Sequence, residues 1–97
     1  MVESRRVYNI QWTNQYKRDV KLAKKRKYKM EELYSVVRKL ANDEPLEDCY
    51  HDHALEGNWV GHRELHIRSD WLLIYQKMDN ILVLELSRTG THSDLFK

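Results

Sequence analysis

The amino-acid sequence predicts an α+β fold in which an antiparallel-rich sheet carries two helices on one face. Three observations lead to this prediction. Two segments in the first half repeat apolar residues at helical spacing, three segments in the second half have the composition of strands, and those strands are joined by very short connectors. The order strand, helix, helix, strand, strand, strand is typical of helices packed on one face of a sheet.

The bulk composition indicates one soluble domain that spans residues 1–97. The 97 residues are 41% hydrophobic and 33% charged, which is typical of a folded protein. No apolar run approaches the ~18 residues of a membrane span, and the first ten residues lack the apolar core of a signal peptide. The single cysteine, Cys49, excludes an internal disulfide and a Cys-rich zinc ribbon. We therefore expect a cytoplasmic protein without a membrane partner.

The first half of the chain predicts one strand and two helices. Residues 5–13 alternate as in a strand, and Thr13 or Asn14 can cap the helix that follows. After a break near residues 27–29, a second helix shows apolar residues at i, i+3, i+4 and i+7 and ends before Pro45. The apolar faces of the two helices consist of Tyr16, Val20 and Ala23, and of Met30, Leu33, Tyr34, Val37, Leu40 and Ala41.

The second half predicts a loop and three strands. Residues 44–59 have the composition of a loop, and strands are expected at 59–69, 70–78 and 80–88. The two-residue connectors between these strands predict antiparallel hairpins.

The last predicted strand carries apolar residues of one parity. Leu82, Leu84 and Leu86 suit the core face, and Arg88 continues the same parity. Arg88 should therefore lie at the edge of the core, unless a β-bulge intervenes.

Charge is segregated along the chain, although the net charge is only +2. Residues 17–29 hold eight basic residues and one acid, whereas residues 31–48 hold six acids and two basic residues. A basic patch of this kind attracts phosphate-rich partners. A solvated helix face explains the same pattern, and the sequence alone does not separate the two explanations.

Five histidines, at positions 51, 53, 62, 66 and 92, suggest either a metal site or acid–base chemistry. Zinc is disfavoured, because His62 and His66 on a strand stand about 13 Å apart. The pair His51 and His53 could supply two ligands, but no third is evident. We therefore expect no metal and no other cofactor.

Cleavage of RNA is a reaction that histidines catalyse without a metal. The ribose 2′-OH attacks the adjacent phosphate, and this step requires a base, an acid and a cation beside the phosphate. Imidazole can be the acid or the base near neutral pH. A guanidinium binds two phosphate oxygens at once, and aromatic rings hold unstacked bases.

Residues of these types occur in three separate segments. Each one also has an ordinary structural explanation, as an exposed loop residue, a turn residue, a helix cap or a core ring. Spacing alone therefore leaves an active site and a purely structural role both open. The candidates are His53, then His66, Asp70 and Trp71, and finally Arg88, His92 and Phe96.

These same residues lie in stretches that resemble a known family. "DHALEGNWVGHRELHIRSDWLLIY" at 52–75 and "RTGTHSDLF" at 88–96 resemble the YafQ branch of the RelE/ParE superfamily of bacterial toxins. "QYKRDVKLAKKR" at 15–26 is similar to the N-terminal half of that branch. The resemblance implies the microbial-ribonuclease-like (RelE-like) β-α-α-β-β-β fold. It also implies a ribosome-dependent mRNA endoribonuclease that cuts mRNA in the A site.

The resemblance also implies roles for individual residues. The catalytic set of the family falls on His53, His66, Asp70, Arg88 and His92, and positions that shape the site around the mRNA fall on Trp71 and Phe96. We expect His92 to be the general acid, Arg88 to bind the phosphate, and Asp70 or a nearby histidine to be the base or to orient it. His53 and His66 would position and neutralise the phosphate. Ribosomal RNA would contact Lys17, Arg18, Lys21, Lys24 and Lys25.

The resemblance further implies partners. The expected partners are a RelB/DinJ-like antitoxin, in a complex that is expected to be a heterotetramer, the 30S A site with its mRNA, and operator DNA only together with the antitoxin. Two alternative functions are compatible with the same fold but do not involve RNA cleavage. One is a ParE-like toxin that inhibits DNA gyrase, and the other is a non-catalytic nucleic-acid-binding module, such as a repressor subunit.

Overall fold

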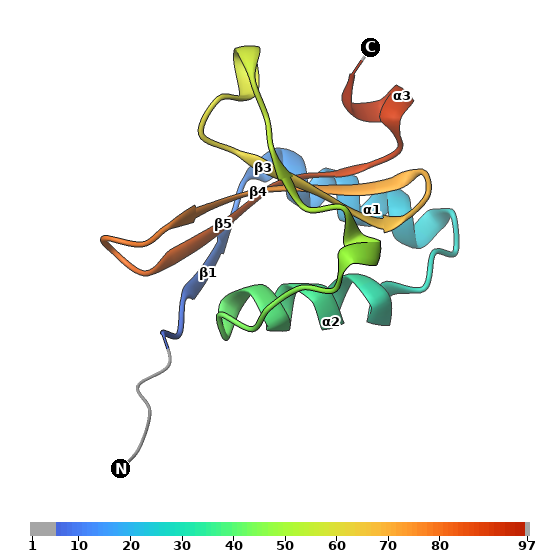
Figure 1. The fold of residues 1–97 in the computed structure, drawn as a ribbon. Coiled ribbons are helices and arrows are strands. Elements are labelled where there is room, and N and C mark those ends of the chain that lie inside the picture. Colours follow the sequence, from blue (N-terminus) through green and yellow to red (C-terminus); the bar gives the residue numbers. More distant parts are fainter. Residues whose placement is uncertain (1–5, 97) are drawn as a thin grey trace.

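The computed structural model describes residues 6–96 (Figure 1). Residues 1–5 lie outside the described residues. They include Arg5 of the predicted first strand and part of the ten-residue N-terminal segment that lacks a signal-peptide core. The α+β fold and the predicted order of elements are confirmed, with a very short strand and a C-terminal helix in addition. The strands are β1 (Asn9–Trp12), β2 (His53–Ala54), β3 (Arg63–Arg68), β4 (Trp71–Met78) and β5 (Val83–Gly90); the helices are α1 (Asn14–Lys25), α2 (Met30–Ala41) and α3 (His92–Leu95), with 3₁₀ turns η1 (Asp48–Tyr50) and η2 (Gly57–Trp59).

The strands form a five-stranded sheet in the order β1-β5-β4-β3-β2. β1 runs parallel to β5, and the other three neighbouring pairs are antiparallel. The sheet is therefore antiparallel-rich, as predicted. β1 forms one edge of the sheet beside β5, and α1 and α2 connect it to the remaining strands (Figure 1).

Local signals in the sequence set the ends of the helices. The Thr13 hydroxyl accepts a hydrogen bond from the Tyr16 N–H at 3.0 Å and so caps α1. Lys27, in the predicted break, has a φ of 61°, which ends the helical path between α1 and α2. α2 ends at Ala41, ahead of Pro45. Of the two candidate caps of α1, the structure therefore selects Thr13.

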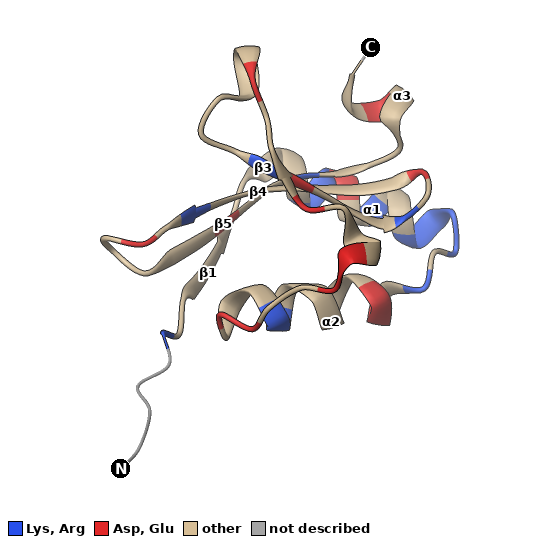
Figure 2. Ribbon diagram, in the orientation of Figure 1, with Lys and Arg blue, Asp and Glu red and all other residues tan. Residues whose placement is uncertain are grey.

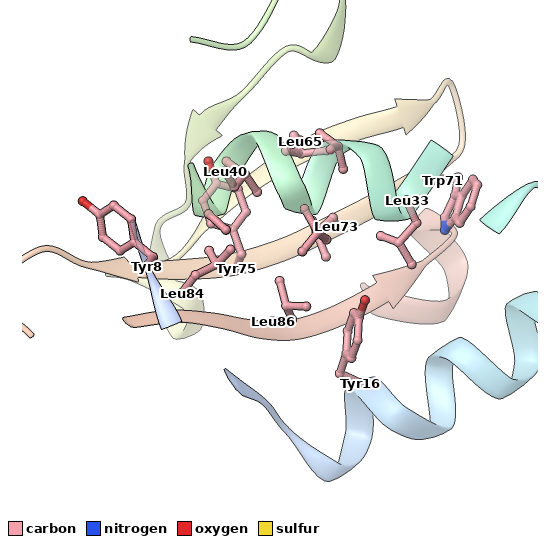
Figure 3. Packing of buried hydrophobic residues seen from close by; sticks show 13 residues of the cluster. Tyr8, Tyr16, Leu33, Leu40, Leu65, Trp71, Leu73, Tyr75, Leu84 and Leu86 are labelled. Carbon is pink, nitrogen blue, oxygen red and sulfur yellow. The ribbon is translucent and has the colours of Figure 1, made fainter. Parts of the chain in front are cut away.

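The main core lies between the two helices and one face of the sheet (Figure 3). α2 supplies Leu33 and Leu40, and α1 supplies Tyr16. These side chains meet residues of alternate positions on the strands, as expected for a sheet with one face covered by helices. The strand residues are Leu65 of β3, Trp71, Leu73 and Tyr75 of β4, and Leu84 and Leu86 of β5.

The opposite face of the sheet is covered only in part, by the short helix α3 and by loop residues. Leu72 and Ile74 of β4 pack there against Leu95 of α3, with Leu55 and Trp59 beside them. Figure 1 shows α2 below the sheet, with α3 and the segment that contains η2 above it. We call this upper side the helix-free face, because neither α1 nor α2 covers it.

A register shift in β5 changes the predicted side of Arg88. Tyr75 pairs with Leu86, but Ile74 pairs with Arg88, so Ser87 is an extra residue in the ladder. This bulge places Arg88 in register with Ile74 on the helix-free face. The prediction placed Arg88 at the edge of the core unless a β-bulge intervened, and the structure has that bulge.

The prediction for Leu82 was wrong. Its φ of 52° places it in the turn before β5, and its side chain is 37% exposed instead of lying in the core. Strand pairing begins only at Val83, because the connection from Met78 needs more residues than the two predicted. None of the helices described for residues 6–96 combines the length and the apolar composition that a membrane span requires.

Candidate active site on the helix-free face

Two rows of paired residues bring the predicted site residues to one side of the sheet. Glu64 pairs with Ile74, which pairs with Arg88, and His66 pairs with Leu72, which pairs with Gly90. Directly paired residues point to the same face, and neighbouring strands are about 4.8 Å apart. The Cα atoms of Glu64 and Arg88 are therefore separated by about 10 Å, which two strand spacings give.

The turn between β3 and β4 holds His92 at the start of α3. The Asp70 carboxylate accepts a hydrogen bond from the His92 backbone N–H at 2.9 Å, and the same oxygen lies 2.7 Å from Nδ1 of the His92 ring. The backbone hydrogen bond, and then the ring hydrogen bond, lower the pKa of Asp70 below its ordinary value. Asp70 is therefore ionised at neutral pH and is suited to orient the imidazole rather than to accept a proton.

α3 is fixed to the rest of the molecule at its first turn. Thr91 and Asp94 form a capping box, in which the Thr91 hydroxyl accepts from the Asp94 N–H and the Asp94 carboxylate accepts from the Thr91 N–H. Arg26, which follows α1, donates two hydrogen bonds to Asp94 at 2.7 and 3.2 Å. These contacts, first of all the one with Arg26, hold the pKa of Asp94 well below its ordinary value.

Four imidazoles gather over this part of the sheet. The His66 ring centroid lies 5.7 Å from that of His92, 6.4 Å from that of His53 and 5.7 Å from that of His51. The separated chain segments that carry the predicted His53, His66, Asp70 and His92 therefore meet here. His51 joins them, although it had been considered only as a possible zinc ligand.

A buried carboxylate lies beneath two of the rings. Oε1 of Glu64 is 3.3 Å from Nε2 of His53 and 3.8 Å from Nε2 of His66, and the Glu64 side chain is only 7% exposed. The backbone carbonyl of His51 lies 2.6 Å from Nδ1 of His53. Because a carbonyl oxygen only accepts, Nδ1 of His53 carries a proton and its Nε2 faces Glu64.

Sequence reasoning missed Glu64, although one signal pointed to it. Glu64 has the same strand parity as His66 and lies two residues away, so the two share a face. A carboxylate at that position is expected to be solvent-exposed unless another segment covers it. The cover comes from β2, where His53 pairs directly with Glu64. His62 does not join the cluster, since its ring packs against Trp59 with centroids 5.2 Å apart.

The Arg88 guanidinium is fixed by a residue of α1. Asp19 of α1 accepts hydrogen bonds from Nε and Nη2 at 2.8 and 3.1 Å. The Arg88 side chain keeps 21% of its surface exposed. A guanidinium has five N–H donors, so Asp19 leaves three of them unused.

The two predicted aromatic residues differ in their surroundings. Trp71 is 4% exposed, donates from Nε1 to the Thr89 hydroxyl at 3.0 Å, and lies 4.9 Å from the Tyr28 ring. It therefore packs in the core below the site, and its expected role in shaping the site around the mRNA stays a prediction. Phe96 directly follows α3 and is 42% exposed, so its ring is open to a ligand.

The predicted RNA-binding residues lie on the solvent side of α1. Asp19 is the acid of this basic segment, and it points inward to Arg88, so the outer surface is left basic. Figure 2 shows the basic residues along α1 and in the turn after it. The exposed members of the predicted set are Lys17, Arg18, Lys21, Lys24 and Lys25.

The histidine cluster has the composition of a metal site but not the geometry. Over residues 6–96, no group of three or more His, Cys, Asp or Glu side chains is arranged to hold a metal ion. The His53 and His92 rings are tilted relative to the His66 ring, with centroids 6.4 and 5.7 Å from it, and Glu64 Oε1 lies 3.3 Å from Nε2 of His53. Imidazoles gathered in this way can exchange protons with a bound phosphodiester.

Comparison with known proteins agrees with this description. The family model of YafQ, a bacterial toxin of type II toxin–antitoxin systems, matches residues 8–97. The mRNA interferase toxin YafQ of Escherichia coli K12 is 45% identical over 89 residues, which is 91% of this chain and 95% of that protein.

Solved structures give the same result. The crystal structure of YafQ from E. coli BL21(DE3) has a TM-score of 0.87 and 40% identity, over 93% of this chain and 99% of that one. YafQ in the E. coli DinJ–YafQ toxin–antitoxin complex has a TM-score of 0.85 and 43% identity, over 93% and 98% of the two chains. The resemblance inferred from the sequence is confirmed, and the chain belongs to the YafQ family of bacterial type II toxin–antitoxin toxins.

Proposed function

We propose that this toxin is a ribosome-dependent mRNA endoribonuclease that cleaves in the A site by metal-free acid–base catalysis. The observation that carries the proposal is the convergence of His53, His66, Asp70 and His92, together with Arg88, on the helix-free face. The mRNA interferase name of the E. coli relative supports the same reaction class.

In the proposed reaction, the general base and the general acid come from different histidines of the cluster. An imidazole of His53 or His66 removes the proton from the 2′-OH, whose oxygen then attacks the adjacent phosphorus. Arg88 stabilises the negative charge that develops on the non-bridging oxygens. The bond to the 5′ oxygen breaks, and that oxygen takes a proton from His92. The products are a 2′,3′-cyclic phosphate and a 5′-hydroxyl.

Asp70 and Glu64 then act through the histidines. Asp70 holds the His92 ring from Nδ1, which leaves Nε2 of that ring to face the leaving oxygen. Glu64 lies beside Nε2 of both His53 and His66, where an ionised carboxylate would compensate a proton gained by either ring. Phe96 would stack on a base of the bound codon.

The basic outer surface of α1 would contact the phosphates of ribosomal RNA. We place the protein in the cytoplasm, where translating ribosomes supply the substrate. Its expected binding partner is a DinJ-like antitoxin, since the structure of an E. coli YafQ was solved in complex with DinJ. We further propose a heterotetramer with the antitoxin, and binding to operator DNA only as part of that complex.

The test is cleavage of a defined mRNA on programmed ribosomes. His92→Ala should lower the rate by about 10²–10⁴-fold, which is the usual contribution of a general acid. Asp70→Ala should also lower it, by a smaller factor. Ser93→Ala, at an exposed position next to His92 on α3, is the matched control and should retain the rate.

Full activity in both His92→Ala and Asp70→Ala would contradict the mechanism. A toxin of the ParE type would inhibit supercoiling by DNA gyrase and leave the mRNA intact, so a supercoiling assay on the same preparation separates the two functions.

A further inference from the structure

We propose that Asp19 of α1 is a positioning residue for RNA cleavage: it holds one edge of the Arg88 guanidinium and so aims the other edge at the scissile phosphate. This inference rests on the proposed function. Asp19 would touch no substrate atom and would act through Arg88 alone.

The Asp19 carboxylate is almost completely enclosed and fully hydrogen-bonded. The residue is 8% exposed. Oδ2 accepts from Arg88 Nε at 2.8 Å and from the Thr89 backbone N–H at 3.1 Å. Oδ1 accepts from Arg88 Nη2 at 3.1 Å and from Gln15 Nε2 at 3.0 Å. Four donors therefore fix the position of this carboxylate before any ligand binds.

The contact uses only one edge of the guanidinium. Nε and Nη2 together form the side edge of the planar group, and both donate to Asp19. Of the three remaining N–H groups, one on Nη1 and the outer one on Nη2 form the end edge, and the second on Nη1 points back toward Cδ. That end edge is the fork that binds two phosphate oxygens. Asp19 therefore orients Arg88 without consuming its phosphate-binding donors.

The fold explains why a helix residue is needed at this point. β1 ends at Trp12, which pairs with Leu86, whereas β5 continues to Gly90. On the side where β1 pairs, no strand within residues 6–96 lies beside β5 beyond Leu86. Thr13 and Asp19 take that place, since the Thr13 hydroxyl donates to the Ser87 carbonyl at 2.8 Å and Asp19 accepts from the Thr89 N–H. The β-bulge at Ser87 lies within this same stretch.

A purely structural ion pair would have the same contacts, so the test must separate positioning from stability. A double-mutant cycle with Asp19→Asn and Arg88→Ala does so. The single-turnover cleavage rate and the KM for programmed ribosomes are measured for all four proteins, at a temperature where each is folded. Asp43→Asn is the matched control, because Asp43 also pairs with a cation, Lys77 at 2.6 Å, away from this face.

With Arg88 present, Asp19→Asn should lower the cleavage rate by about 10–100-fold and change KM by less than about threefold, as expected when a transition-state contact is misplaced. With Arg88→Ala already in place, the same substitution should change the rate by less than about twofold. Equal losses in both backgrounds, or no loss with Arg88 present, would overturn the proposal.

A spectroscopic measurement tests the inference independently of cleavage. The Arg88 Nε–H signal in a ¹H–¹⁵N spectrum should be resolved and protected from exchange in the native protein, and it should be lost in Asp19→Asn. An unchanged signal in Asp19→Asn would overturn the inference. Absence of any cleavage by the native toxin would instead overturn the proposed function, and the Nε–H result would then show only whether Asp19 orients Arg88.

Discussion

Replacement of Trp71 by phenylalanine tests whether this ring belongs to the core or to the substrate surface. The change removes about 40 Å³ from a packed site, which at about 24 cal/mol per Å³ costs about 1 kcal/mol. It also leaves the buried Thr89 hydroxyl without the donor now 3.0 Å away, at a cost of about 1 kcal/mol. The free energy of unfolding should therefore fall by about 2 kcal/mol, which is the sum of these two costs.

For a chain of 97 residues, this loss lowers the melting temperature by roughly 8–16 °C. Urea denaturation and thermal unfolding measure it. Trp12→Phe is the matched control, because Trp12 is 54% exposed and its replacement should change stability by less than about 0.5 kcal/mol. At a temperature where all proteins are folded, Trp71→Phe should cleave within about threefold of the native rate. Native stability together with a large rise in KM would show that Trp71 contacts the substrate.

Three further predictions follow from the anchoring of α3 and from the basic helix. Gly90→Ala would place a Cβ 2.9 Å from Asp94 Oδ2. The substitution should cost about 2 kcal/mol of stability and slow cleavage by displacing α3. A melting temperature and a cleavage rate like those of the native protein would contradict this. Because the pKa of Asp94 is depressed mainly by Arg26, its stabilising effect is complete above about pH 4 and is lost as the pH falls below that value. The stability difference between the native protein and Asp94→Asn, about 1 kcal/mol at pH 7, should therefore shrink below pH ~4 in denaturation series, and a difference that grows on acidification would refute the sign. Reversal of Lys21, Lys24 and Lys25 to glutamate should weaken ribosome binding and flatten its salt dependence, while an unchanged affinity would assign these lysines to a solvated helix face.

Periodicity was sufficient to predict the framework of the fold, because it reports which face of each element is buried. α2 follows the spacing of Leu33, Val37 and Leu40, and β5 buries Leu84 and Leu86. The bulge at Ser87 and the long turn around Leu82 have no signal of their own in the sequence. They follow from how β5 is paired with β4, which is a tertiary property.

The candidate site was predictable in its residue types but not in its supporting contacts. The resemblance selected His66, Asp70 and His92, which the structure places together. Asp19 lies 69 positions from Arg88 in the chain, so no local pattern could connect them. Glu64 was missed for a similar reason, since its burial depends on β2, which has only two residues. The burial of Trp71 was not predictable from the resemblance, which identifies a position and does not report its exposure.

The most direct test of the central claim is the chemistry of the cut RNA ends. An mRNA cleaved by the toxin on programmed ribosomes should carry a 2′,3′-cyclic phosphate or its 3′-phosphate hydrolysis product on one fragment, and a 5′-hydroxyl on the other, as determined by mass spectrometry. A 2′-deoxy substitution at the scissile nucleotide should abolish cleavage. A 3′-hydroxyl with a 5′-phosphate, or undiminished cleavage of the 2′-deoxy mRNA, would contradict attack by the 2′-OH between His53, His66, Arg88 and His92.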